Sequence, residues 1–402
     1  MNKETKRYLI AYDNNKTGLP AISKLLDVAD SYIKDGVAAM VNGGIPGDDD
    51  ILHFKNSCVI SKRMTQAEAD KLSSEKGITA ICPDMEISLP DEEFVPTVNK
   101  PGPTGKPTPQ WNMQLVKAPE AWQNGYQGSG IKVAIVDTGI SDNPDLVIAG
   151  GVSFVPGEPS WNDDSSHGHG THCAGIVGAR GLKEVYGVAP QCTLYAVKIS
   201  KGDETAPLTR LTAAMDWCMD SANGIQVVSC SFAIKEPPTS YMSKLMAKYQ
   251  QKLVMVFCTG NSYREKETVF NFVNYPANSF LKDVPEASPI AVGSVDRYKK
   301  IAPTSSRGGA YPDWNPVTVV APGVSIDSTT IPGTKGNYSN ASGTSMACAH
   351  VAGLAALILG KSPSLTPADV MSKITTTAKN LGKGNPNETY GYGLINCEAA
   401  TT

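Results

Sequence analysis

Apolar runs alternate with stretches of helical spacing through the last three quarters of the chain. The runs lie in IKVAIVD (131–137), TLYAVKI (193–199), IQVVSCS (225–231) and KLVMVFCTG (252–260). Between them, residues 208–220 and 241–251 carry apolar side chains at helical spacing, and a further helix is expected from about His169. Strands that are apolar throughout are typical of a mostly parallel sheet with helices on both faces. We therefore predict an α/β domain over residues 111–402, with its site at the carboxyl ends of the strands.

A shorter set of elements comes before this domain. Strands are expected over 7–12, 53–62 and 78–89, and an amphipathic helix over 19–36. A second helix is expected over 65–77, because Thr65 and Glu68 have the spacing of a capping box and Gly77 suits the C-terminal cap. Residues 1–89 are therefore predicted to form a small α+β domain.

Residues 90–110 differ in composition from the sequence on either side. They contain six prolines and three acidic residues, with almost no apolar periodicity. Such a composition predicts an exposed, extended linker. The chain is therefore expected to divide into 1–89, 90–110 and 111–402.

Composition and charge argue against two classes of partner. The formal net charge is −3 over 402 residues, with no concentrated basic stripe, so nucleic acid is not an expected partner. The longest apolar run, Val351–Leu359, is too short to span a bilayer, and the first residues lack the apolar stretch of a secretory signal. Nine cysteines without C-x-x-C pairs predict reduced, mostly buried thiols rather than a disulfide framework or a structural zinc site. We therefore expect no membrane partner and a cytoplasmic protein, and export by another route stays open as the alternative.

Two polar groups stand next to these predicted elements. Asp137 directly follows the apolar strand in VAIVDTGI, where an aspartate is either functional or a turn former or helix cap. The segment DDSSHGHGTHCAGIVGA contains three of the five histidines. Their HxHxxH spacing lacks the H-x-x-x-H register of a helical zinc site, and the glycines suit a tight entry into a helix. His169, in the first turn of that helix, is therefore the candidate base.

Ser345 precedes the apolar helix predicted from MACAHVAGLAALIL. It is either a helix cap or a nucleophile, because a helix N-terminus also favours the negative charge of an oxyanion. A serine hydroxyl needs a base, and the base needs a carboxylate to orient it, which Asp137 and His169 would supply. Asn261, in VFCTGNS, is a candidate side-chain donor to the oxyanion, or a loop residue in a Gly-Asn turn.

The segments VAIVDTGI, HGTHCAG and GTSMACAHVAG, in the order Asp, His, Ser, resemble the three signature blocks of the subtilisin-like serine proteases. The resemblance extends from about Trp111 to YGYGLINCEAA. It implies a serine endopeptidase with Asp137 as orienting carboxylate, His169 as base and then acid, Ser345 as nucleophile and Asn261 as oxyanion donor. His167 and His172 then become structural neighbours. Cys173 follows His172 as in the proteinase K branch and is expected to pack rather than react.

The same resemblance implies a cleft for an extended peptide or protein substrate. It places Ser231, Phe232 and Ala233 along one wall and Gly260 nearby, and it pairs Glu204–Ala206 with the peptide on the opposite wall. Leu208, Leu211 and Phe232 are then expected to line an apolar pocket. The i, i+3 spacing of the two leucines equally fits a helix that packs in the core.

The sequence departs from the family pattern at several positions. Cys348 and Ala349 replace the usual small hydroxyl residue and proline after the nucleophile, and the missing proline frees a main-chain N–H. Cys258 and Asn274 stand near the expected first specificity pocket, which they are expected to narrow.

The segment GARGLKEVYGVAP (178–190) replaces a loop that binds calcium in many relatives. Gly181–Lys183 offer no side-chain oxygen ligands there. A weaker calcium site near Asp296 and Pro276 stays open, although Asp296 equally suits a turn. We assign no metal and no cofactor.

The first ninety residues resemble the family's propeptide, which implies an intramolecular inhibitor and a self-processed zymogen. Cleavage is expected between Leu89 and Pro109. Three alternatives stay open: a permanently attached interaction domain, a peptide ligase of the same fold, for which Ala349 is the hint, and a catalytically silent peptide-binding protein.

Overall fold

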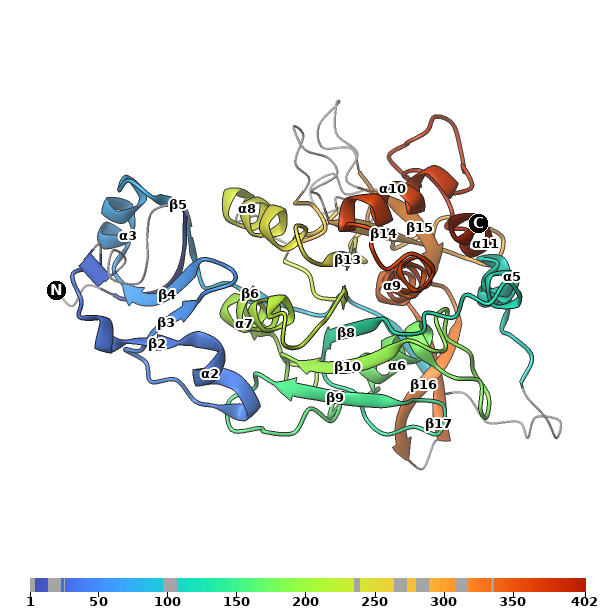
Figure 1. Cartoon of the computed structure of the whole chain (residues 1–402), viewed down its shortest axis with the longest axis horizontal. Coiled ribbons are helices and arrows are strands. Elements are labelled where there is room, and N and C mark those ends of the chain that lie inside the picture. The colour runs from blue at the N-terminus through green and yellow to red at the C-terminus, as the bar shows by residue number, and fades with distance from the viewer. Residues whose placement is uncertain are drawn as a thin grey trace.

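The computed structural model has two lobes (Figure 1). It describes residues 4–13, 23–24, 26–96, 107–234, 239–263, 273–279, 289–308, 317–333 and 336–402. The N-terminal lobe lies on the left of Figure 1 and contains the N-terminus, and the C-terminus lies on the far side of the larger lobe.

The larger lobe is built on a seven-stranded sheet. In spatial order its strands are β15 (Val319–Pro322), β14 (Ile290–Val295), β13 (Val254–Cys258), β12 (Val227–Cys230), β8 (Lys132–Asp137), β10 (Thr193–Lys198) and β9 (Ile148–Ser153). Every neighbouring pair is parallel. Successive residues of β13 and β14 point to opposite faces of the sheet and are all buried, so protein covers both faces. The predicted parallel α/β fold is confirmed.

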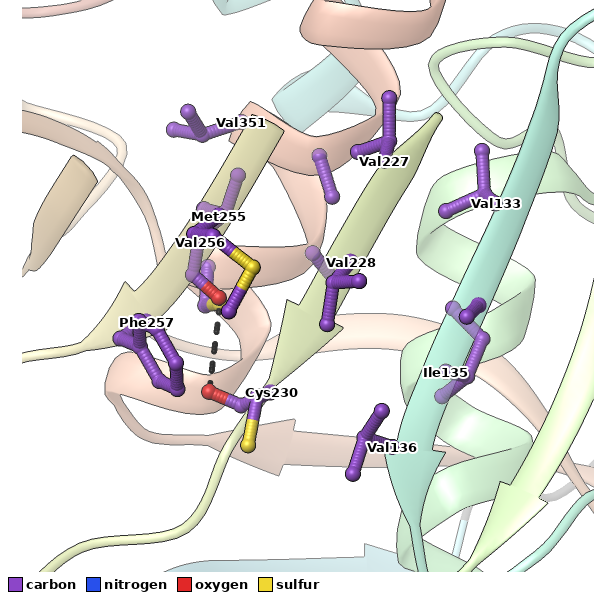
Figure 2. Packing of buried hydrophobic residues seen from close by; sticks show 14 of the residues in the cluster. Val133, Ile135, Val136, Val227, Val228, Cys230, Met255, Val256, Phe257 and Val351 are labelled. Atoms are coloured by element: carbon purple, nitrogen blue, oxygen red, sulfur yellow. Dashed lines mark hydrogen bonds between the residues drawn. The ribbon is translucent and has the colours of Figure 1, made fainter. Parts of the chain in front are cut away.

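Helices cover this sheet and place its functional residues. They are α4 (Trp111–Leu115), α5 (Ala118–Gln123), α6 (His169–Gly178), α7 (Leu208–Met219), α8 (Thr239–Tyr249), α9 (Thr344–Lys361), α10 (Pro367–Thr377) and α11 (Cys397–Thr401). Figure 2 shows Val351 of α9 beside the valines of β12 and β13. Within the described part of the chain, α9 has the length and composition of a membrane span, but 89% of it is buried inside the protein. It is a core helix.

The N-terminal lobe is a five-stranded sheet with short helices. Its strands, in spatial order, are β2 (Ile33–Asp35), β3 (Ile51–Phe54), β4 (Val59–Met64), β1 (Lys6–Tyr12) and β5 (Ile78–Pro83). Its helical segments are the 3₁₀ turns η1 (Asp30–Tyr32) and η2 (Val41–Gly43) and the helices α2 (Gly36–Met40) and α3 (Gln66–Ser73). The predicted capping box of Thr65 and Glu68 is present at α3.

Four expectations for this lobe are wrong. Residues 78–89 are not one strand, because β5 ends at Pro83 and residues 86–87 form a separate strand in another sheet. Residues 53–62 are not one strand, because a turn with Cys58 at a φ of +53° separates β3 from β4. The helix expected over 19–36 does not continue beyond Asp27, whose φ is also +53°, and residues 14–22 lie outside the described part. Gly77 is not the cap of α3, since Ser74 occupies that position.

The two lobes meet where the small sheet rests on α7 and α8. Asp84 caps α7 from the other lobe, because its carboxylate accepts hydrogen bonds from the Thr209 N–H at 2.8 Å and the Thr209 hydroxyl at 2.6 Å. Tyr249 of α8 donates its hydroxyl hydrogen to Ser57 Oγ at 3.1 Å. The lobes are therefore joined by buried polar contacts as well as by the chain.

The segment after β5 forms two short strands against the larger lobe. Strand β6 (Glu86–Ile87) pairs with β11 (Ala206–Pro207), and β7 (Glu93–Pro96) pairs with β17 (Gly336–Ser342), whose other neighbour is β16 (Ile326–Gly333). The predicted linker over 90–110 therefore differs from the structure in its first part, which is paired rather than exposed and free. Residues 97–106 lie outside the described part of the chain.

Candidate active site

Asp137 and His169 meet at the carboxyl edge of the sheet. Asp137 is the last residue of β8, and His169 is the first residue of α6. The Nδ1–H of His169 donates a hydrogen bond of 2.6 Å to Asp137 Oδ1, and both side chains are buried. The same carboxylate oxygen accepts a hydrogen bond from the Thr138 N–H at 2.8 Å. This contact orients the imidazole and directs its Nε2 away from Asp137.

Ser345 is the second residue of α9, and Asn261 lies beside the N-terminus of that helix. The side-chain oxygen of Asn261 accepts a hydrogen bond from the Thr344 N–H at 3.0 Å, which orients its amide. The Nδ2 of Asn261 donates a 2.8 Å hydrogen bond to the main-chain carbonyl of Asp91. The expected oxyanion donor therefore binds a carbonyl of the N-terminal segment.

The expected hydrogen bond between Ser345 and His169 is not formed. Ser345 Oγ makes no hydrogen bond to the residues that the structure describes. The Oε2 of Glu92 lies 3.2 Å from His169 Nε2, and the Glu92 side chain is only 3% exposed. Glu92 thus occupies the side of the imidazole that would otherwise face a serine hydroxyl.

Two carboxylates act on the imidazole of His169. Burial lowers its pKa, but the negative charges of Asp137 and then Glu92 raise it, and the resulting pKa is well above 6.5. The imidazolium form is therefore favoured near neutral pH while Glu92 is in place. A protonated Nε2 does not act as a base.

The contacts of Asp91 with Asn261 and of Glu92 with His169 were not predicted from the sequence. Both residues belong to a PDEEF segment that was interpreted as linker, and three consecutive acidic residues do not show which one is buried. Phe94 also faces the site, because its ring stacks on His167 with 5.2 Å between centroids. No alternation of apolar and polar residues marks 92–95 in the sequence, and the alternation of partly buried and exposed side chains there is a property of the fold.

Two further side chains near His169, those of His172 and Cys173, are buried and uncharged. His172 Nε2 lies 3.1 Å from the main-chain oxygen of Ile326, and burial lowers the pKa of His172 to about 3. Cys173 has ligand atoms of Asp137 and His169 within 4.8 Å, and burial raises its pKa well above 9.0. Both are neutral neighbours, as the resemblance implies.

The residues predicted to form the walls of the cleft pair with the segment that precedes Asp91. Ser88 and Ala233 exchange two main-chain hydrogen bonds of 3.1 and 2.9 Å, and Ile87 pairs with Ala206. The pairing on this second wall involves Ala206–Pro207 and not the expected Glu204–Ala206. The N-terminal segment is therefore an added strand between the two walls.

The predicted pocket residues are fully buried in the presence of this strand. They belong, together with Ile87, to one continuous apolar cluster: Leu208, Leu211 and Phe232. Ser231 is also buried, and its hydroxyl makes no hydrogen bond within the described residues. An apolar residue at the position of Ile87 thus completes the core on this side.

Comparison with known proteins identifies the family. Residues 128–393 match the model of the subtilase family. The chain belongs to the subtilase family. It is similar to an alkaline protease of Alkalihalobacillus alcalophilus, with 32% identity over 398 residues, which are 98% of this chain and 91% of the relative. Subtilisin BL of Lederbergia lenta is 38% identical over 292 residues, or 72% of this chain and 98% of the relative. A thermostable alkaline protease of Halalkalibacterium halodurans is 30% identical over 402 residues, 100% of this chain and 93% of the relative. This subtilase is a subtilisin-like serine endopeptidase.

Asn274, one of the two residues expected to narrow the first specificity pocket, lies directly against Gly260 in this subtilase. Gly260 has a φ of +96°, and a Cβ built on it would lie 2.1 Å from the Asn274 side-chain nitrogen. The Asn274 N–H donates a 2.9 Å hydrogen bond to the Thr259 carbonyl, which fixes the position of its main chain. Asn274 therefore fills the space beside Gly260, and any larger residue at 260 would displace it.

The residues of the 181–185 loop do not fit a calcium ion. Calcium needs several converging oxygen ligands. In this subtilase, the Asp145 carboxylate instead accepts main-chain hydrogen bonds of 2.6, 2.7, 2.8 and 3.0 Å from residues 182–185. Tyr338 adds its hydroxyl at 2.8 Å. Five donors thus compensate the charge of Asp145.

The weaker cation site considered at Asp296 has the geometry of a turn. Its Oδ1 accepts main-chain hydrogen bonds from Tyr298 at 2.8 Å and Lys300 at 2.9 Å. These contacts support the role of Asp296 as a turn residue, which was one of the two roles that the sequence left open.

Proposed function

We propose that Asp137, His169 and Ser345 form the catalytic triad of this endopeptidase and that Asn261 stabilises the oxyanion. The observation that carries the proposal is the hydrogen bond from Asn261 Nδ2 to the carbonyl of Asp91, in a segment that already pairs with the cleft wall. A donor aimed at a main-chain carbonyl beside a helix N-terminus is what the intermediates of peptide hydrolysis require.

Hydrolysis then follows from the positions of these groups. Ser345 Oγ attacks the carbonyl carbon of the substrate, and its proton passes to His169 Nε2. The negative oxygen accepts hydrogen bonds from Asn261 Nδ2 and from the N–H of Ser345. As the carbon–nitrogen bond breaks, His169 returns the proton to the leaving amine. Water then attacks the acyl-enzyme and gives a proton to His169. The ester bond to Ser345 Oγ breaks as His169 returns this proton to Oγ, and Asp137 orients the imidazole throughout.

The proposed substrates are extended peptides and protein segments. Main-chain hydrogen bonds of the kind made by Ser88 with Ala233 give affinity without regard to sequence. Selectivity comes from the side chains that point into the walls, and the position of Ile87 favours an apolar residue there.

We propose further that the full chain is a self-processed precursor and that its N-terminal lobe is an intramolecular inhibitor. Three contacts support this: the pairing of β6 with β11, the carbonyl of Asp91 on Asn261, and the carboxylate of Glu92 against His169. Together they fill the cleft and favour the protonated imidazole.

A reducing compartment such as the cytoplasm is the proposed location of the protein. All nine cysteines are free thiols and all are buried. Burial raises the pKa of Cys218 and Cys397, so these thiols are neutral and unreactive.

Two measurements test the proposed function. Intact mass spectrometry of the full chain and of its Ser345→Ala variant shows whether Ser345 cuts the chain, and we expect a shorter product only from the unmodified protein. Identical masses would contradict self-processing. Labelling with a fluorophosphonate is expected to modify Ser345 and to be lost in His169→Ala, and labelling that survives this change would contradict the triad.

A further inference from the structure

The helix that carries His169 has no side-chain cap of its own. Its N-cap residue is Gly168, so the first N–H groups of α6 need acceptors from elsewhere. Ser165 Oγ accepts from the His169 N–H at 3.0 Å, and Thr138 Oγ1 accepts from the Gly170 N–H at 3.0 Å. The Thr171 N–H donates to Asp163 at 2.9 Å. The start of this helix is therefore held by residues outside it.

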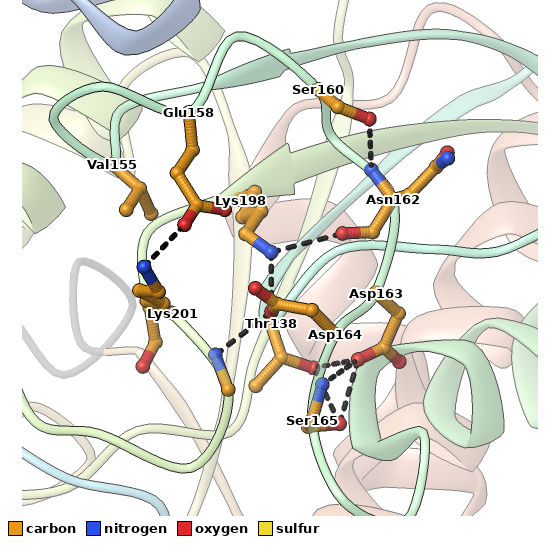
Figure 3. A network of polar contacts seen from close by, with 12 residues as sticks. Thr138, Val155, Glu158, Ser160, Asn162, Asp163, Asp164, Ser165, Lys198 and Lys201 are labelled. Carbon is orange, nitrogen blue, oxygen red and sulfur yellow. Dashed lines mark hydrogen bonds and ion pairs between the residues drawn. The ribbon is translucent and has the colours of Figure 1, made fainter.

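Asp163 joins these acceptors into one network, part of which Figure 3 shows. Its Oδ1 accepts hydrogen bonds from the Thr138 hydroxyl at 2.9 Å, the Ser165 hydroxyl at 2.6 Å and the Ser165 N–H at 3.1 Å. Its Oδ2 accepts from the Thr171 N–H at 2.9 Å and the Thr171 hydroxyl at 2.8 Å. Asp163 is 5% exposed, so water contributes little to its solvation.

The network connects the two members of the catalytic pair. Thr138 follows Asp137 directly and donates its own N–H to Asp137 Oδ1. Ser165 holds the N–H of His169 itself. The carboxylate of Asp163 therefore ties the end of β8 to the start of α6, and these are the two elements whose separation sets the 2.6 Å hydrogen bond.

We propose that Asp163 is a positioning residue of this endopeptidase, which acts through Thr138 and Ser165 to hold Asp137 and His169 in register. The proposal rests on the catalytic roles proposed above for that pair. Asp163 is not placed in contact with substrate, and it takes no part in proton transfer.

Replacing Asp163 by asparagine would break one of its main-chain hydrogen bonds. Each carboxylate oxygen accepts one main-chain N–H, from Ser165 on Oδ1 and from Thr171 on Oδ2. In either orientation of an asparagine amide, its NH₂ group would face one of these fixed donors. One buried N–H then loses its acceptor, and the loop or the helix must move.

The neighbouring Asp164 provides a matched control. It lies in the same loop, and its carboxylate pairs with Lys198 and accepts the Gly202 N–H at 2.8 Å, away from α6 (Figure 3). The substitutions Asp163→Asn and Asp164→Asn therefore remove the same charge from adjacent positions. Only the first disturbs the network that reaches His169.

The test compares these variants in the intact chain, whose band a denaturing gel separates from any cleaved product. We expect Asp163→Asn to slow the fluorophosphonate labelling of Ser345 per folded molecule by up to about 100-fold, because a shift of about 1 Å in reacting groups has effects of that order. The NMR resonance of the proton between Asp137 and His169 is expected to shift or broaden. Asp164→Asn is expected to keep both the rate and the resonance.

A second pair of variants serves if Asp163→Asn does not fold. Thr138→Val removes the hydroxyl that links Asp163 to Gly170, whereas Thr138→Ser keeps it. We expect slow labelling and an altered resonance in the valine variant and recovery of both in the serine variant. Equal behaviour of the two would overturn the proposal.

His169→Ala separates this inference from the triad itself. If His169→Ala abolishes labelling while Asp163→Asn labels as fast as the unmodified chain with an unchanged resonance, Asp163 has no positioning role. Labelling that survives in His169→Ala instead contradicts the triad on which the inference rests.

Discussion

Replacing Glu92 by glutamine would remove one charge beside His169, the proposed catalytic histidine. The carboxylate lies 3.2 Å from His169 Nε2, and the two side chains are only 3% and 4% exposed. We expect this substitution to make the intact chain more reactive, because glutamine does not favour the imidazolium form. The matched control is Glu93→Gln, which removes the same charge from the next, exposed residue of the chain.

The size of the effect follows from two opposing terms. Unit charges 3.2 Å apart attract by about 5 kcal/mol at an effective dielectric constant of about 20. Taking the Glu92 carboxylate out of water costs several kcal/mol and offsets part of this attraction. A net contribution of about 1.5–3 kcal/mol is typical of a hydrogen bond or ion contact to a charged group. Labelling of Ser345 should therefore rise about 10- to 100-fold.

The assay follows fluorophosphonate incorporation in the band of the intact chain, which a denaturing gel separates from any cleaved product. The rate is compared among the unmodified chain, Glu92→Gln and Glu93→Gln. If Glu92→Gln labels no faster than Glu93→Gln, the contact between Glu92 and His169 does not restrain the nucleophile. The electrostatic account of inhibition would then be refuted, and filling of the cleft would have to suffice.

Three further predictions concern pH, the interface between the lobes and metal. The pKa of His169 is raised above 6.5, so its ion pair with Glu92 is complete below about pH 6.5 and is lost as pH rises through the raised pKa. Labelling of the intact chain should therefore increase with pH above 6.5. The increase should be smaller in Glu92→Gln. A pH-independent rate would contradict this. Asp84→Ala removes the cap of α7 and should lower the free energy of unfolding of the full chain in urea by about 0.5–2 kcal/mol, whereas an unchanged midpoint would mean that the cap is not needed. Chelation by EDTA should leave the melting temperature unchanged, because main-chain donors compensate Asp145, and a fall that added calcium reverses would show a metal site in the chain.

The sequence predicted the large sheet because β8, β10, β12 and β13 are apolar almost throughout. Strand β9 was not predicted, since its sequence IAGGVS contains two adjacent glycines, which are unfavourable in a strand. The hairpin of β3 and β4 was missed because the left-handed position of its turn is Cys58 and not a glycine or asparagine, and Asn56 alone did not mark the turn. Strands β14 and β15 were not predicted either, although both are fully buried. Local patterns thus predicted four of the seven strands of this sheet and missed the turn at Cys58.

The same limit applies to the site. Asp137, His169, Ser345 and Asn261 stand in motifs, so their positions could be proposed from the sequence. Glu92 could not, because its role depends on the pairing of β7 with β17, a strand far along the chain. Asp163 was equally hidden, since the run DDSS offers several polar side chains and only the folded loop shows which one accepts five hydrogen bonds.

A cut between β6 and β7 would leave these two strands on different fragments of the chain. Strand β6 is continuous with the N-terminal lobe, so a fragment ending there can leave by dissociation and is lost on dilution. Strand β7 stays joined to α4 through the chain and lies against β17. It would compete with substrate at an effective concentration on the order of millimolar, whatever the protein concentration. Full exposure of that side of the cleft would need a second cut nearer to α4.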